Sequence, residues 1–119
     1  MSENKLLDEL ITLSREAGRE DRHLAILGEG NTSVDAGDGT FWIKASGTSL
    51  STANAESFSR IRMDAVLAYV ERAQMTDLEV GEELAAVLVD PQYKRPSTET
   101  FMHAVLLSEG GARWVAHTH

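Results

Sequence analysis

The sequence predicts one α/β domain of the α+β-like kind over residues 1–119, with helices flanking a central mixed or antiparallel sheet. Helix-like and strand-like patterns are mixed along the chain without the regular βαβα order of a parallel sheet. Two early β-prone runs surround a glycine-rich turn, which is typical of an antiparallel hairpin. The chain has 119 residues, 42% of them hydrophobic, so it is long enough for one hydrophobic core.

The first elements follow from periodicity. Apolar residues recur at helical spacing from Leu6 to Ala17 with charged residues opposite them, which predicts an amphipathic helix that Gly18 ends. The β-prone run over residues 24–33 precedes the turn Ala36-Gly37-Asp38-Gly39. The segment Thr40–Lys44 then supplies the second strand of the hairpin.

The middle of the chain predicts a short strand and two helices. Ser59–Met63 alternates polar and apolar residues, as a half-buried strand does. Residues 64–74 carry apolar positions at helical spacing and predict a helix. Thr76 and Glu79 have the spacing of a capping box, which predicts a second helix that runs to about Val89.

The last third predicts a helix followed by a strand. The helix begins after Pro96-Ser97-Thr98-Glu99 and ends at Gly110-Gly111, because consecutive glycines stop a helix. Arg113–His119 then predicts a closing strand.

Composition narrows the classes of function. Lys and Arg number 11 and Asp and Glu number 19, so the formal net charge is -8. An acidic chain repels phosphate backbones, which argues against a nucleic-acid partner. The sequence shows no signal-peptide pattern and no membrane-length apolar stretch, so we expect a cytoplasmic protein without a membrane partner. There is no cysteine, which excludes disulfides and thiolate metal sites.

Two histidines stand two positions apart at His117 and His119. On a strand both side chains point to the same face, where two imidazoles can converge on one metal ion. The alternative is a polar strand end with two solvated histidines.

An acidic residue, Glu99, lies in the first turn of the last predicted helix. A carboxylate there is favoured by the helix dipole, and near a metal it can act as a general acid or base. His103 lies one helical turn later on the same face and can orient Glu99 or a metal ligand, although a hydrogen-bonded core position is the commoner explanation.

Three short turns are rich in small polar residues. Each offers backbone N–H groups and hydroxyl or amide groups that can bind phosphate, although each is also simply a turn. The first matches neither a Walker loop nor the dinucleotide-binding glycine fingerprint. The turns are Gly28–Ser33, Ser46–Thr48 and Ser97-Thr98.

Four motifs in this order resemble those of class II aldolase/adducin domains, from about residue 6 to the end. The family includes fuculose- and rhamnulose-phosphate aldolases, ribulose-phosphate 4-epimerase, methylthioribulose-phosphate dehydratase and the adducin head. The motifs are Gly30-Asn31-Thr32-Ser33, Lys44-Ala45-Ser46-Gly47-Thr48, Pro96-Ser97-Thr98-Glu99 and His117-Thr118-His119.

The resemblance implies a role for each matching residue. Glu99 would be the catalytic acid/base, and His117 and His119 would be the first two ligands of a zinc ion or another divalent transition metal. The substrate phosphate would be bound in one cleft by Asn31, Ser46, Gly47, Ser97 and Thr98.

The implied function is zinc-dependent retro-aldol cleavage of a sugar phosphate through a metal-stabilised enediolate, in a homo-oligomer that is a tetramer in the family. Alternatives are a 4-epimerase or dehydratase of the same family, a non-catalytic adducin-like oligomerisation module, and a small-molecule binder without catalysis. The family's third zinc-binding histidine lies beyond His119, so we expect 1–119 to be part of the domain.

Overall fold

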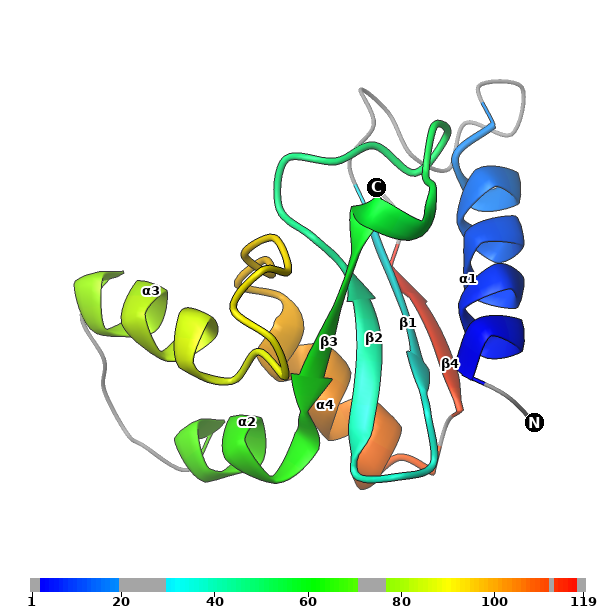
Figure 1. The fold of residues 1–119 in the computed structure, drawn as a ribbon. Helices are drawn as coiled ribbons and strands as arrows, with labels where there is room; N and C mark the ends of the chain where they lie inside the picture. The colour runs from blue at the N-terminus through cyan, green and yellow to red at the C-terminus, as the bar shows by residue number, and fades with distance from the viewer. Residues whose placement is uncertain (1–2, 20–29, 71–76, 112, 118–119) are drawn as a thin grey trace.

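The computed structural model describes residues 3–19, 30–70, 77–111 and 113–117. The elements follow in the order α1 (Glu3–Ala17), β1 (Asn31–Asp35), β2 (Thr40–Lys44), η3 (Ala55–Ser57), β3 (Phe58–Arg62), α2 (Met63–Val70), α3 (Asp77–Ala86), α4 (Thr100–Ser108) and β4 (Trp114–His117). The four strands form one sheet in the order β3-β2-β1-β4, and every neighbouring pair is antiparallel (Figure 1). The predicted α+β-like fold with a mixed or antiparallel sheet is therefore confirmed.

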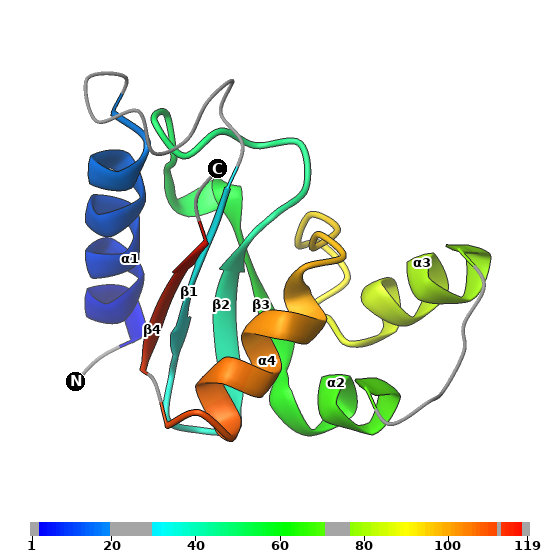
Figure 2. The ribbon, with the colours of Figure 1, turned by 180° about the vertical axis from the view of Figure 1, so that it is seen from behind.

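Helices cover both faces of the sheet. Helix α1 packs on one face, and α4 crosses the other face with α2 beside it (Figures 1 and 2). Because strand side chains alternate, β2 contributes to both cores: Phe41 and Ile43 face α2 and α4, whereas Trp42 faces α1. The predicted N-terminal amphipathic helix is confirmed, with Leu6 and Leu10 buried against the sheet.

The predicted hairpin is the pair β1–β2, with Ser33 opposite Ile43. Its turn contains Gly37 and Gly39 at φ 84° and 87°, a left-handed conformation that favours glycine. The first strand begins at Asn31, and residues 24–29 of the predicted run lie outside the described residues.

One predicted boundary was wrong. The helix expected to reach Val89 ends at Ala86, because the following residues pair with the edge strand β3 instead. Leu88 forms a bridge with Ile61, and the Val89 N–H donates to the Arg60 carbonyl at 2.9 Å. Thr76 and residues 71–74 of the preceding helix lie outside the described residues.

The predicted last helix and strand are confirmed as α4 and β4. The helix ends before Gly110, where an added Cβ would lie 2.7 Å from the Leu106 carbonyl oxygen. Strand β4 is an edge of the sheet and places His117 beside Asn31 of β1. In the described part of the chain, no helix combines the length and apolar character that crossing a membrane requires.

Candidate active site

Three residues from three elements meet at one end of the sheet. Asn31 begins β1, and its register partner His117 ends the described part of β4. Glu99 immediately precedes α4, which packs against both strands. His117 Nδ1 lies 3.1 Å from Glu99 Oε2, and Asn31 Nδ2 donates a hydrogen bond to the same oxygen. A carboxylate, a neighbouring imidazole and a buried amide therefore meet as one unit at Glu99 Oε2.

Ser97 connects this unit to the start of α4. Its hydroxyl oxygen accepts from Asn31 Nδ2 at 3.1 Å and from the Glu99 N–H at 3.3 Å. Its carbonyl oxygen accepts from the Thr100 N–H at 3.1 Å and from Thr100 Oγ1 at 2.6 Å. Glu99 is the residue before the first helical turn and makes no capping bond through its side chain, so its carboxylate is directed to Asn31 and His117.

Glu99 is ionised at neutral pH. Burial raises the pKa of its carboxyl, but hydrogen bonds from Asn31 and His117 and electrostatic interactions with His117 and His103 outweigh that effect, so the pKa lies below its usual value. An ionised carboxylate next to an imidazole can accept a proton from a substrate.

His103 is fully buried below this unit. Its Nδ1 lies 2.5 Å from Ser33 Oγ, and its Nε2 has no hydrogen-bond partner among the described residues. Burial lowers the pKa of His103 to about 4; the charge of Glu99 opposes this shift, and that of His117 adds to it. His103 is therefore a neutral, hydrogen-bonded core residue, which was the commoner of the two explanations for it.

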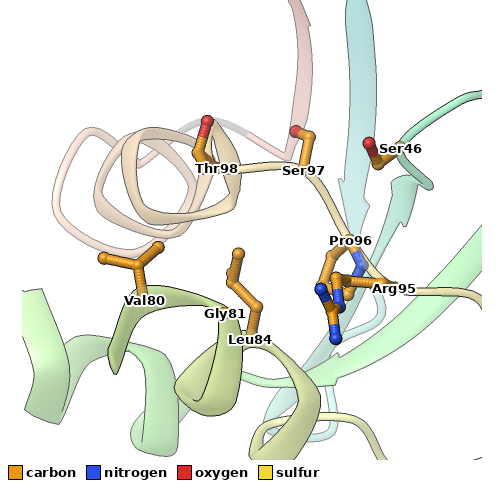
Figure 3. Close-up of a pocket in the computed structure, with 8 residues that line it drawn as sticks. All are labelled: Ser46, Val80, Gly81, Leu84, Arg95, Pro96, Ser97 and Thr98. Atoms are coloured by element: carbon orange, nitrogen blue, oxygen red, sulfur yellow. The ribbon is translucent and has the colours of Figure 1, made fainter. Parts of the chain in front are cut away.

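A cavity of about 360 Å³ opens beside Ser97. Three residues predicted to bind phosphate, Ser46, Ser97 and Thr98, line it, although they come from two separate turns. In Figure 3 their hydroxyl oxygens lie on the side of the cavity away from α3. Its full lining is Ser46, Val80, Gly81, Leu84, Arg95, Pro96, Ser97 and Thr98.

The turn that follows β2 is tightly held. The Ser46 N–H donates to the Arg95 carbonyl at 3.0 Å, and Ala45 forms a bridge with Pro96. Gly47 has φ 81° and is exposed, and an added Cβ there would meet no atom within 4 Å. The turn therefore stays next to Ser97 and Thr98, as the predicted cleft requires, while the binding roles of these residues stay predictions.

Two basic residues near the cavity had no predicted role. Lys44 is only 5% exposed and lies at the end of β2. The sequence does contain a sign of this position. Lys44 stands two residues after Trp42 on the same strand, so it lies on the same, otherwise apolar, face of the strand. Arg95 is an exposed residue of the cavity lining and precedes Pro96. Nothing in the local pattern distinguishes it from the neighbouring Lys94.

The donors around Glu99 fit part of a zinc site. Zinc accepts imidazole nitrogens and carboxylate oxygens, and a carboxylate on Nδ1 of a histidine leaves Nε2 available as a ligand. His117 has this arrangement with Glu99. His119 lies outside the described residues, and those that are described contain no group of three metal-ligating side chains.

Comparison with known proteins gives consistent results. Residues 8–119 match the model of the class II aldolase and adducin N-terminal domain family. The chain is 34% identical over 123 residues to "Uncharacterized oxidoreductase YuxG" of Bacillus subtilis (strain 168). That match covers 97% of this chain but 17% of YuxG, so the chain spans less than a fifth of the length of this relative.

Solved structures show the same fold. The N-terminal class II aldolase domain of a conserved protein from Thermoplasma acidophilum superposes with a TM-score of 0.82 and 36% identity, over 95% of this chain and 54% of that chain. An L-fuculose 1-phosphate aldolase superposes with a TM-score of 0.65 over 100% of this chain and 46% of that chain. At 17% identity, this second match is evidence for the fold alone.

Proposed function

The chain belongs to the class II aldolase and adducin N-terminal domain family, and from that premise we propose that it cleaves a carbon–carbon bond of a sugar phosphate. The observation that carries the proposal is the contact between Glu99 and His117, next to Asn31 and the cavity at Ser97. The amide of Asn31 holds the carboxylate in one position beside the imidazole, which favours a proton-transfer role for Glu99 over a purely structural one.

In this proposal Glu99 moves the proton of the reaction. During cleavage the electron pair of the breaking carbon–carbon bond stays on the hydroxy-ketone fragment as an enediolate. The ionised Glu99 takes up the proton that leaves the hydroxyl group of the future aldehyde and delivers it to the enediolate carbon. In the reverse, condensing direction it takes a proton from that carbon and returns it to the aldehyde oxygen. Asn31 and His117 hold Oε2 in place, so the carboxylate changes its protonation state without changing its position.

The turns bind the phosphate and so position the reacting carbons. Ser46, Ser97 and Thr98 offer hydroxyl groups, and Gly47 offers a backbone N–H in an exposed turn. Binding energy from a remote phosphate can be used to orient the carbon–carbon bond, which raises the rate of the chemical step. Asn31 Nδ2 already donates to Ser97 and Glu99, and its predicted phosphate contact stays a prediction.

His117 and His119 would hold the metal, which would supply Lewis acidity toward the substrate. The contact of Glu99 with Nδ1 orients the His117 ring and leaves Nε2 as the nitrogen available to a metal. The name of YuxG contains the word oxidoreductase, but that protein is much longer than this chain. The glycine turn at residues 28–33 of this chain lacks the dinucleotide-binding fingerprint.

The test is an assay of the full protein against ketose 1-phosphates that differ in the stereochemistry of their hydroxyl groups. The expected result is release of a ketone phosphate and an aldehyde, abolished by a metal chelator. Inversion at C4 without release would instead indicate an epimerase, and loss of water a dehydratase. No turnover of any member of the panel under metal-replete conditions would contradict the proposal.

A further inference from the structure

A second polar contact joins α4 to β1, beside the contact between Glu99 and Asn31. Ser33 Oγ and His103 Nδ1 share a hydrogen bond of 2.5 Å, and both side chains are fully buried. Ser33 lies two residues after Asn31 on β1, so the two side chains lie on the same face of the strand. His103 lies one helical turn after Glu99, and its backbone N–H donates to the Glu99 carbonyl oxygen at 3.0 Å. The backbone therefore connects the Ser33–His103 pair to both partners of the neighbouring contact.

Apolar packing makes up the rest of the contact between α4 and the sheet. Ala104 and Leu107 belong to one core cluster with Phe41 and Ile43 of β2. Among the described residues, His103 is the one member of α4 whose side chain hydrogen-bonds to the sheet, because the hydroxyl groups of the helix bond to carbonyl groups close by in the sequence. Apolar contacts are not directional, whereas a hydrogen bond requires a narrow range of distance and angle. The hydrogen bond of His103 therefore determines where α4 lies on the sheet.

The stability of the core does not account for this polar pair. His103 Nε2 has no hydrogen-bond partner within the described part of the chain, and an unpaired buried polar atom costs about 1–3 kcal/mol. Alanine and leucine at the two positions would bury apolar surface and leave no polar atom unpaired. Replacing both partners of a buried hydrogen bond by apolar groups of similar shape can be nearly neutral or stabilising. A positioning role explains why a polar pair stands here.

We propose that the hydrogen bond between Ser33 and His103 positions Glu99 for proton transfer. By fixing α4 on β1, it keeps the Glu99 carboxylate against Asn31 and His117. The inference rests on the proposed function of Glu99. A catalytic group must be held within about 0.5 Å of its productive position, and a displacement of about 1 Å can cost roughly 10²-fold in rate. Both members of the pair are positioning residues, since they are fully buried and act through Glu99.

The experiment removes the hydrogen bond without leaving one of its partners unpaired. Ser33→Ala/His103→Leu replaces both partners by apolar side chains, and His103→Gln is the conservative variant that keeps a polar partner for Ser33. Ser14→Ala is the matched control. Ser14 forms the corresponding buried contact on the other face of β1, where its Oγ lies 2.5 Å from Thr32 Oγ1.

The probe is dihydroxyacetone phosphate, incubated in D₂O with the metal-replete full protein or a variant. The saturating rate of proton exchange and the half-saturating concentration are measured by proton NMR, with a thermal melt of each protein. We expect the double variant to lose roughly tenfold to hundredfold in the saturating rate. Its half-saturating concentration and its melting temperature should stay close to those of the wild type, because the phosphate site and the core are retained.

The other two variants separate positioning from packing. His103→Gln should keep most of the saturating rate, because it restores a partner for Ser33. Ser14→Ala should exchange like the wild type, even where its melting temperature falls. An equal loss of rate in Ser14→Ala would overturn the inference, because the rate would then follow the packing of β1 in general.

Two results for the double variant would also overturn the inference. A wild-type saturating rate would show that the pair serves the core alone, and a double variant that no longer folds would show that the pair is required for stability. Failure of the underlying function gives a different result. If the wild type exchanges no proton, the proposed role of Glu99 is overturned together with the inference, whereas equal exchange by the wild type and the double variant overturns the inference alone.

Discussion

Glu99 Oε2 lies 3.1 Å from His117 Nδ1, which joins the residue before α4 to the last described residue of β4. The register of the sheet adds Asn31, because Asn31 and His117 are direct partners on β1 and β4. With Nδ1 directed at a carboxylate, the imidazole orientation is fixed and its other nitrogen is the one that can bind a metal.

Glu99→Gln should abolish most proton transfer without unfolding the protein. The glutamine oxygen can still accept hydrogen bonds from Asn31 and His117, but it cannot take up a proton at neutral pH. We expect a loss of roughly 10²- to 10⁴-fold in kcat, the usual contribution of a general acid or base. Glu82→Gln, on the exposed face of α3, is the control and should leave kcat unchanged. Activity of Glu99→Gln within tenfold of the wild type would remove Glu99 from the mechanism.

His103 should make the fold less stable in mild acid. Its folded-state pKa of about 4 lies below its ordinary 6.5, so between these pH values the unfolded chain takes up a proton that the folded chain does not. The contribution is fully present above pH 6.5 and is lost as the pH falls toward 4, by up to about 3 kcal/mol. Urea denaturation at intervals from pH 7.5 to 4 measures it.

The matched variant is His103→Gln, which keeps a polar partner for Ser33 but does not titrate. Its free energy of unfolding should be lower at pH 7.5 and nearly flat between pH 6.5 and 4.5. Glu99 does not account for a change in the free energy of unfolding between pH 6.5 and 4.5. Its pKa is lowered from 4.5, so its own effect on stability falls below that range. A wild-type stability that stays constant from pH 6.5 to 4.5 would show that His103 is not buried as described.

Two glycine-to-alanine changes should have opposite signs. At Gly18 an added Cβ would lie 2.4 Å from the Ser51 nitrogen and 2.7 Å from the Leu50 carbonyl carbon, so the end of α1 must move away from the backbone. We expect a loss of about 1–3 kcal/mol, as for other overpacked sites. At Gly81, inside α3, the nearest contact is Arg95 Nη1 at 3.8 Å, and alanine should stabilise the helix by about 0.5–1 kcal/mol. Thermal melts of the two variants compare them directly; stabilisation by Gly18→Ala would contradict the described packing.

The sequence predicted the elements better than their ends. Local periodicity identified α1, the hairpin, α4 and β4, because each has its own apolar pattern or glycine signal. It could not place the end of α3 at Ala86, since Leu88 continues the helical pattern but pairs with Ile61 of β3. Pairing between distant segments is a tertiary effect that overrides local propensity.

The sequence predicted which residues belong to the site, but it did not predict how they are arranged. The resemblance implied that Asn31, Ser46, Gly47, Ser97 and Thr98 share one cleft. Ser46, Ser97 and Thr98 line one cavity, and Asn31 and Gly47 are not among its lining residues. Nothing in the motifs indicated that Asn31 donates to Glu99, or that a lysine at the end of β2 is buried. These features depend on strand register and on how α4 packs, which are set by contacts far apart in the sequence.

The central claim is that Glu99 moves a proton at the carbon next to a ketone, and one measurement tests it without knowledge of the aldehyde partner. Dihydroxyacetone phosphate is incubated with the metal-replete full protein in D₂O, and loss of its hydroxymethyl proton signal is followed by proton NMR. We expect one of the two protons to exchange, and we expect a chelator or Glu99→Gln to stop the exchange. No exchange by the wild type, or equal exchange by Glu99→Gln, would contradict it.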